Sequence, residues 1–147
     1  MTSDAVWNDA FSRAIGVCQA NDLKLIDPLV AKVDGRPDCY WVLDIASAVS
    51  DRLGMGETAD EETGQIMLHL MVRKASGINT PTALSHVKAM STAFRASRIT
   101  TQPQGWPEGL FYRGQSNAPP NLDDTGNWYV LTLMVDYTYQ DALEQQP

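Results

Sequence analysis

Two segments of the chain space their apolar residues in the way that is typical of amphipathic helices. Near the N-terminus, apolar side chains recur at steps of three and four residues and share one stripe: Trp7, Phe11, Ala14, Ile15 and Cys18. A second helix is predicted from Thr80, a good N-cap residue, with Pro81 in the first helical position. Its inward stripe is expected to comprise Leu84, Val87, Met90, Ser91 and Phe94.

Four further segments have the pattern of β-strands, at residues 39–45, 65–74, 109–113 and 128–140. The second of them alternates most clearly. Ile66, Leu68, Leu70 and Val72 point one way, and Met67, His69 and Met71 point the other way. Because this second face is also largely apolar, we expect a helix or another subunit to cover it.

The elements follow the order α-β-β-α-β-β, which predicts an α+β fold with two helices packed on a mostly antiparallel four-stranded sheet. A chain of 147 residues has the length of one domain, residues 1–147, with a frayed tail at 141–147. Residues 23–33 are ambiguous, because Asp27-Pro28 interrupts them. Residues 46–53 have the pattern of a turn of helix, and the acidic stretch after them that of an exposed loop.

The charge balance limits the possible partners. The chain has 11 basic and 18 acidic residues, a net charge of −7. Because binding to a phosphate backbone needs clustered cations, tight nucleic-acid binding is disfavoured. No apolar run is long enough to span a membrane, and the first residues lack the pattern of a secretory signal. We therefore expect a soluble protein, with Cys18 and Cys39 as two part-buried thiols in a reducing compartment.

No arrangement of residues indicates a catalytic, cofactor or metal site. His69 and His86 lack the spacing of metal ligands. Ser85 and His86 are neighbours on a predicted helix, so their side chains point about 100° apart and form no nucleophile–base pair. The adjacent carboxylates Glu61 and Glu62 lie in a polar stretch with little to raise their pKa. The sequence therefore disfavours an enzyme.

Two groups of residues are candidates for contact surfaces. Tyr129, Tyr137 and Tyr139 of the last strand either close one side of the core, or the outer tyrosines belong to a protein contact, where aromatic residues are enriched. Tyr137 and Tyr139 form the candidate subunit or tube interface together with Met67, His69 and Met71. The acids Glu57, Asp60, Glu61 and Glu62 are either a solvated loop or the lining of a surface that must not bind DNA.

Three stretches of the sequence carry a resemblance to a known family. The first is Glu62-Thr-Gly-Gln-Ile-Met-Leu-His-Leu-Met-Val-Arg73, followed by Gly77-Ile-Asn-Thr-Pro and an Ala-rich helix that ends in Phe94. The second is the closing Asn127-Trp-Tyr-Val-Leu-Thr-Leu-Met-Val-Asp-Tyr137, and the third is the opening helix with Trp7 and Phe11. Together they resemble the tail terminator (tail completion) proteins of long-tailed bacteriophages, over nearly the whole chain.

The resemblance implies a virion protein that is assembled in the host cytoplasm. It implies a hexameric ring of this chain on the tail tube protein, which ends tube growth and joins the tail to the head connector. An acidic lumen would let DNA pass without binding, because like charge removes the gain from counterion release. The polar stretches 50–64 and 114–126 would become ordered only on assembly.

Two other hypotheses remain open. Another head–tail joining component, such as a neck or stopper protein, would have the same acidic balance but a different partner. A small soluble enzyme or ligand-binding domain would need a pocket with converging polar groups.

Overall fold

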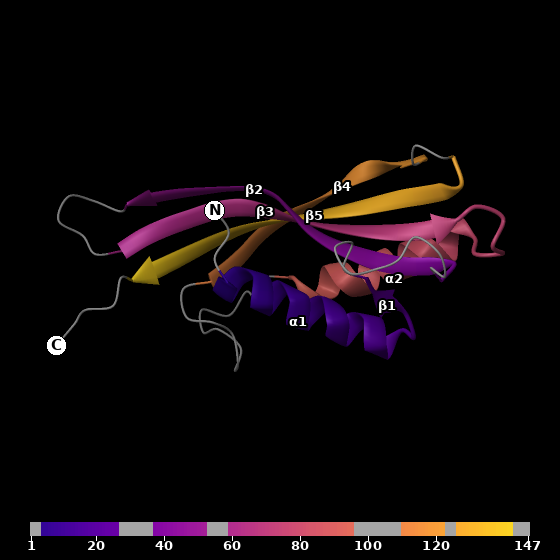
Figure 1. Cartoon of the computed structure of the whole chain (residues 1–147), viewed down its shortest axis with the longest axis horizontal. Coiled ribbons are helices and arrows are strands. Elements are labelled where there is room, and N and C mark those ends of the chain that lie inside the picture. Colours follow the sequence, from indigo (N-terminus) through magenta and orange to yellow (C-terminus); the bar gives the residue numbers. More distant parts are fainter. Residues whose placement is uncertain (1–3, 27–36, 53–58, 96–109, 123–125, 143–147) are drawn as a thin grey trace.

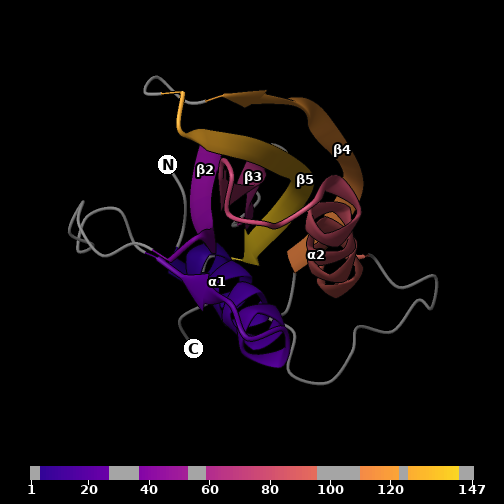
Figure 2. The same ribbon diagram turned by 90° about the vertical axis from the view of Figure 1, so that its right-hand side faces the viewer.

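The computed structural model describes residues 4–26, 37–52, 59–95, 110–122 and 126–142. It contains two helices and five strands: α1 (Asp4–Ala20), β1 (Lys24–Leu25), β2 (Cys39–Arg52), β3 (Ala59–Arg73), α2 (Thr80–Ala93), β4 (Leu110–Leu122) and β5 (Trp128–Ala142). The strands form one sheet in the order β1-β2-β3-β5-β4, and both helices lie on the same side of it (Figures 1 and 2). The α+β class is therefore confirmed.

The sheet has five strands and not the four that were expected. The additional strand, β1, falls in the stretch left ambiguous by the sequence and pairs in parallel with Tyr40 and Trp41 of β2. It forms because the chain reverses directly after α1, where Asp22 adopts a φ of 57° and the Leu23 N–H donates to the Cys18 carbonyl at 2.8 Å. The element order is thus α-β-β-β-α-β-β, and the sheet is mixed.

Strands β2 and β3 are longer than their apolar runs. Their antiparallel pairing continues through polar residues from Ser47↔Gln65 to Arg52↔Asp60. The predicted helical turn at residues 46–53 is therefore wrong for 46–52, and residues 59–64 are strand and not loop. A register shift between Ile45 and Ser47 absorbs one extra residue, as a β-bulge does. In Figure 1 these ends of β2, β3 and β5 extend beyond both helices.

Strand β4 also runs through a stretch expected to be a loop. The short strand at 109–113 continues to Leu122. Pro119 and Pro120 fit there because β4 is at the edge of the sheet and both lie in the irregularity between Ala118 and Asn121. A proline at such a place breaks no ladder hydrogen bond. Residues 50–52, 59–64 and 114–122 are thus strand in a single chain, without neighbours to order them.

Helix α1 faces the sheet with smaller residues than expected. Its buried stripe is Val6, Ala10, Ala14 and Cys18, whereas Trp7 and Phe11 are each 36% exposed. Their place in the predicted core stripe is therefore wrong. The alanines allow the helix backbone to approach the sheet closely, and the two large rings are left on the flank of the helix.

The N-cap of helix α2 lies one residue earlier than expected, at Asn79 and not at Thr80. Asn79 is the N-cap, and its Oδ1 accepts a hydrogen bond from the Thr82 N–H at 3.0 Å. Its inward stripe is Ala83, Val87, Met90 and Phe94, whereas Leu84 is 52% exposed. Neither described helix is long and apolar enough to cross a membrane.

The core lies between the helices and the inner face of the sheet. Trp41 of β2 is fully buried there, together with Ile66, Leu68 and Leu70 of β3 and Val135 of β5. Among the described side chains, the indole N–H of Trp41 is the one buried polar group without a hydrogen-bond partner. Its ring therefore contributes to the core by its volume.

The C-terminal end of the sheet is ordered further than was expected. Asp141 and Ala142, placed in the frayed tail by the sequence, pair with Asp60 and Ala59 of β3. The expectation for residues 143–147 lies outside the described residues.

Substitution of Ala10 tests the close packing of α1. We expect Ala10→Leu to lower the free energy of unfolding by about 1–3 kcal/mol, because the larger side chain pushes the helix away from the sheet. Urea unfolding followed by circular dichroism measures the change. Ser12→Leu, at an exposed position of the same helix, is the control, with an expected change below about 0.5 kcal/mol. Equal stability of Ala10→Leu and the wild type would contradict the close approach.

Candidate functional site

The polar side chains that the fold brings together are bonded to one another. The Asp9 carboxylate lies between α1 and β4, where it accepts hydrogen bonds from Arg13 Nε at 2.7 Å and from the Tyr112 hydroxyl at 2.5 Å. Arg13 also donates to the Ala93 carbonyl at the end of α2, at 3.2 Å. Burial, and then the hydrogen bond to Asp9, raise the pKa of Tyr112 well above its usual range. These groups hold α1, α2 and β4 together and leave no free nucleophile or base.

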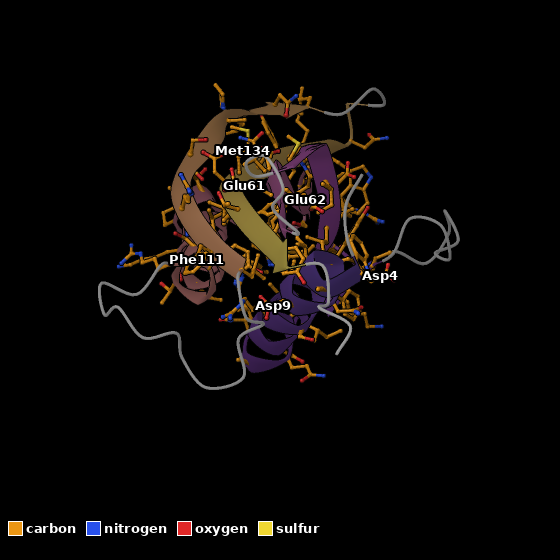
Figure 3. The ribbon with its side chains drawn as sticks, turned by 90° about the vertical axis from the view of Figure 1, so that its left-hand side faces the viewer. Asp4, Asp9, Glu61, Glu62, Phe111 and Met134 are labelled. Atoms are coloured by element: carbon orange, nitrogen blue, oxygen red, sulfur yellow. The ribbon has the colours of Figure 1, made fainter. Side chains whose placement is uncertain are left out.

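The candidate lumen acids divide between different environments. Glu62 lies on the inner face of β3, is only 6% exposed, and accepts a hydrogen bond from the Tyr137 hydroxyl at 2.5 Å. In this chain it therefore does not line an open surface. Glu61 is half-buried on the opposite face, at the end of the sheet that Figure 3 looks onto. Asp60 is paired with Arg52 and Asp141 along the backbone, and Glu57 lies outside the described residues.

The two tyrosines of the candidate interface belong to the core. Tyr137 is 2% exposed, and Tyr139 is half-buried and packed against the core. The sequence left open whether these tyrosines close the core or form a protein contact. In the structure, both rings belong to the core side of the sheet. In β5 it is Tyr129 that is exposed, although it has the same parity as the other two.

The other three residues of the candidate interface lie together on the outer face of the sheet. Met67, His69 and Met71 are half-buried on the face of β3 that is turned away from the helices. They pair across the sheet with Asp44, Val42 and Tyr40 of β2 and with Met134, Thr132 and Val130 of β5. Within the described part of the chain, neither helix covers this face (Figure 2). We call these nine residues the outer sheet face.

One end of the outer sheet face carries a cluster of aromatic and charged groups. Tyr40 packs edge-on against Trp128, with ring centroids 5.4 Å apart. The Arg73 guanidinium lies 5.0 Å from the Trp128 ring centroid, in the geometry of a cation–π contact. Arg73 also pairs with Asp38 at 3.5 Å, an exposed ion pair of small energetic value. This cluster fixes the ends of β2, β3 and β5 to one another.

The sequence interpretation missed two exposed apolar features. The first is the ring pair on α1: Trp7 and Phe11 are stacked, with centroids 6.3 Å apart and planes 28° apart. The signal that would have found it is the run of small residues at Ala10 and Ala14, which marks a different stripe as the buried one. We call this pair the aromatic flank.

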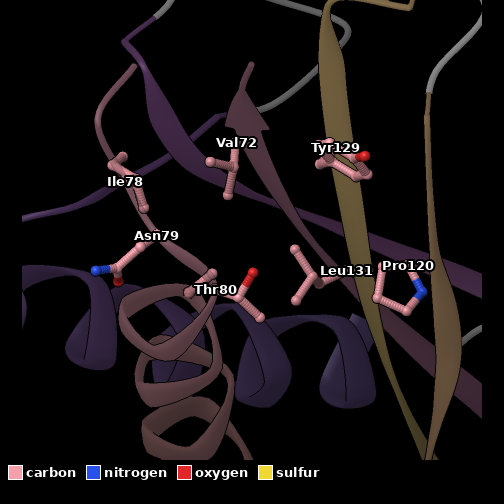
Figure 4. Close-up of a pocket in the computed structure, with 8 residues that line it drawn as sticks. Val72, Ile78, Asn79, Thr80, Pro120, Tyr129 and Leu131 are labelled. Carbon is pink, nitrogen blue, oxygen red and sulfur yellow. The ribbon is translucent and has the colours of Figure 1, made fainter. Parts of the chain in front are cut away.

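The second feature is a hollow of about 260 Å³ beside the start of α2. Figure 4 shows the side chains that line it, which come from the ends of β3 and β5, the start of α2, and β4. They are Val72, Ile78, Asn79, Thr80, Ala83, Pro120, Tyr129 and Leu131. The described lining is mostly apolar and has no charged group, so the hollow suits an apolar side chain better than a polar substrate. We call it the α2 hollow.

Neither the histidines nor the cysteines form a reactive group with their neighbours. His69 Nδ1 lies 2.8 Å from Thr132 Oγ1 on the outer sheet face. Cys18 and Cys39 are free thiols buried in the core. Among the described residues, no group of three or more His, Cys, Asp or Glu side chains is placed to hold a metal ion.

Comparisons with known proteins give information on the fold alone. No protein-family model matches the chain, and no curated protein is similar to it in sequence. Twenty-six chains of solved structures match it. One of these, named only by a sequence identifier, superposes with a TM-score of 0.57 at 14% identity, over 100% of this chain and 99% of that chain. At this identity the match shows that the two chains share a fold over nearly their full length, and it shows nothing about the activity of this chain.

The environment of His69 predicts how stability responds to acid. Burial lowers the pKa of His69 from 6.5, and the Asp44 carboxylate acts in the opposite direction. The folded chain then binds fewer protons at this site than the unfolded chain, so its free energy of unfolding falls as the pH drops below 6.5. We expect His69→Gln to reduce this fall, as measured by urea unfolding on both sides of that pH. His86→Gln is the matched control, and an unchanged pH profile for His69→Gln would contradict the assignment.

The two thiols are expected to be inert in the folded chain. Burial raises the pKa of Cys18 to about 11, with a smaller contribution from Cys39, and burial also raises the pKa of Cys39 to about 11. At about pH 8 roughly one thiol in a thousand is then ionised, and only the thiolate reacts. A disulfide reagent should therefore label neither cysteine in native protein and both in denaturant. Rapid labelling of either cysteine in native protein would contradict this burial.

Proposed function

We propose that this chain is a structural subunit of a phage virion, which forms a hexameric ring on the end of the tail tube. The ring ends tube polymerisation and joins the tail to the head connector. The observation that carries the proposal is the outer sheet face. Six of its nine residues are half-buried, among them Met67, Met71 and Met134, and no described helix packs on this face. Methionine-rich surfaces adapt readily to protein partners.

The division of polar groups supports a role that depends on shape. Asp9, Arg13 and Tyr112 are bonded to one another, and Glu62 is bonded to Tyr137, so the described acids that are most buried are used inside the fold. The surface that remains includes the outer sheet face, the aromatic flank and the α2 hollow. A subunit that assembles by contact needs such surfaces, and an enzyme needs converging reactive groups instead.

The resemblance of the sequence to tail terminator proteins and the α+β fold support the same proposal. Of the elements that carry the resemblance, β3, the start of α2 and β5 contribute to the outer sheet face and the α2 hollow, and α1 carries the aromatic flank. The end of the sheet that extends beyond the helices has Asp60 and Glu61 on β3 and Asp141 on β5. In a ring, an acidic lumen at this end would allow DNA to pass without binding.

Assembly on tail tubes tests the proposal. Light scattering after size-exclusion chromatography is expected to give a hexamer, either for the protein alone or after mixing with the tail tube protein. Negative-stain images should show a ring at one end of each tube, and tubes grown with the protein should stop lengthening.

Two results would contradict this function. A monomer that neither associates nor binds tubes would exclude a terminator ring. Binding to the head-side connector without binding to tubes would assign the chain to a neck or stopper role.

A further inference from the structure

The aromatic flank lies on the side of α1 that is turned away from α2. Asp9 and Arg13 lie on the opposite flank of the helix, because they bond to Tyr112 of β4 and to the end of α2. Successive residues are rotated by about 100° around a helix, so the buried stripe separates Trp7 and Phe11 from that flank. The stacked rings are therefore directed away from α2 and are partly exposed.

The α2 hollow lies in another part of the chain and shares no residue with the aromatic flank. It opens between the start of α2 and the strands β5 and β4. In Figure 2, α1 lies on one side beneath the sheet, and α2 and β4 lie on the other. Each copy of the chain thus presents two exposed aromatic rings on one side and an apolar hollow on the other.

The charges of the two sides are complementary. Helix α2 and strand β4 contain no acidic residue, although the whole chain has a net charge of −7. The cations Lys88, Arg95 and Arg113 are exposed on or next to these elements. On the other side, Asp4 is exposed three residues before Trp7, and the only cation of α1, Arg13, is bonded to Asp9. Among the described residues, two copies placed head to tail would therefore bring the cations of α2 and β4 toward Asp4 of α1.

We propose that the ring closes by a head-to-tail contact, in which the aromatic flank of one copy enters the α2 hollow of the next copy. The contact joins two unlike surfaces, so every copy uses one of each. When a constant rotation between neighbouring copies closes the ring, neither surface stays free on any copy. The apolar rings supply the buried area, and Asp4 against the cations of α2 and β4 fixes the direction. This inference rests on the proposed ring and names the surfaces that form it.

Variants on both sides of the contact test it. Replacing both rings, Trp7→Ala with Phe11→Ala, should raise the dissociation constant for self-association about tenfold or more, as loss of a central aromatic anchor does. Thr80→Trp fills the hollow from an exposed position at the start of α2 and should have the same effect. Ser12→Ala, on the exposed face of α1, is the control and should leave association unchanged. Far-UV circular dichroism checks the fold of each variant.

A mixing experiment separates unlike surfaces from a symmetric contact. The Trp7→Ala/Phe11→Ala variant keeps an open α2 hollow, and the Thr80→Trp variant keeps the aromatic side chains of the aromatic flank. Mixed together, they are expected to form a one-to-one pair that does not grow, because each copy has one functional surface left. Failure of the two variants to pair would overturn the contact.

Charge substitutions test its direction. Lys88→Glu on α2 should weaken association, whereas Lys24→Glu on β1 changes the net charge equally on the other side and should not. Equal effects of the two substitutions would overturn the charge complementarity. If the wild type associates only on tail tubes, the same variants are compared by the number of rings on tubes.

The outcomes distinguish this contact from the proposed function. If the Trp7→Ala/Phe11→Ala variant and the Thr80→Trp variant still form the hexameric assembly of the wild type, the contact is overturned and the terminator function stands. A wild type that forms no ring, alone or on tubes, would overturn both.

Discussion

The pairing of β3 with β5 is the constraint on which the rest of this structure depends. All fifteen residues of β3 pair with the fifteen residues of β5 in one register without a shift, from Ala59↔Ala142 to Arg73↔Trp128. Because side chains alternate along each strand, this register fixes which residues face the helices and which face outward. A slip of one residue would bring Met67 and His69 to the core and expose Leu68. The inner core, the outer sheet face and one wall of the α2 hollow all follow from it.

Given that register, the polar groups near the core act as ties between elements. Asp9, Arg13 and Tyr112 join α1 to β4 and to the end of α2, and Phe94 packs edge-on against Tyr112 with ring centroids 5.1 Å apart. Removing one member of such a cluster costs stability, because the others stay buried without it. The buried hydroxyl and carboxylate groups are therefore explained by the fold.

The sequence predicted the elements that have a strong local pattern of apolar residues. Its predictions failed where contacts with residues distant in the sequence determine the structure. The alternation of Ile66, Leu68 and Leu70 located β3 and both of its faces. The extension of β2 and β3 through residues 47–52 and 59–64 has no apolar pattern and depends on cross-strand pairing. Trp7 and Phe11 have the three- and four-residue spacing of a buried stripe, but the packing of α1 on the sheet buries Val6, Ala10 and Ala14 instead. Of the candidate interface, only the residues of β3 lie on the face that neither described helix covers.

The distribution of charge gives a reason why copies of this chain would meet in one direction. A uniformly acidic protein repels its own copies, and repulsion grows as more copies gather. Here helix α2 and strand β4 contain cations and no acid, so this part of the described surface is locally basic in a molecule of net charge −7. Only the arrangement that sets this side against an acidic side avoids like charges at the contact. Apolar burial can then supply affinity, while electrostatics excludes head-to-head pairs, which would present two basic or two acidic sides to each other.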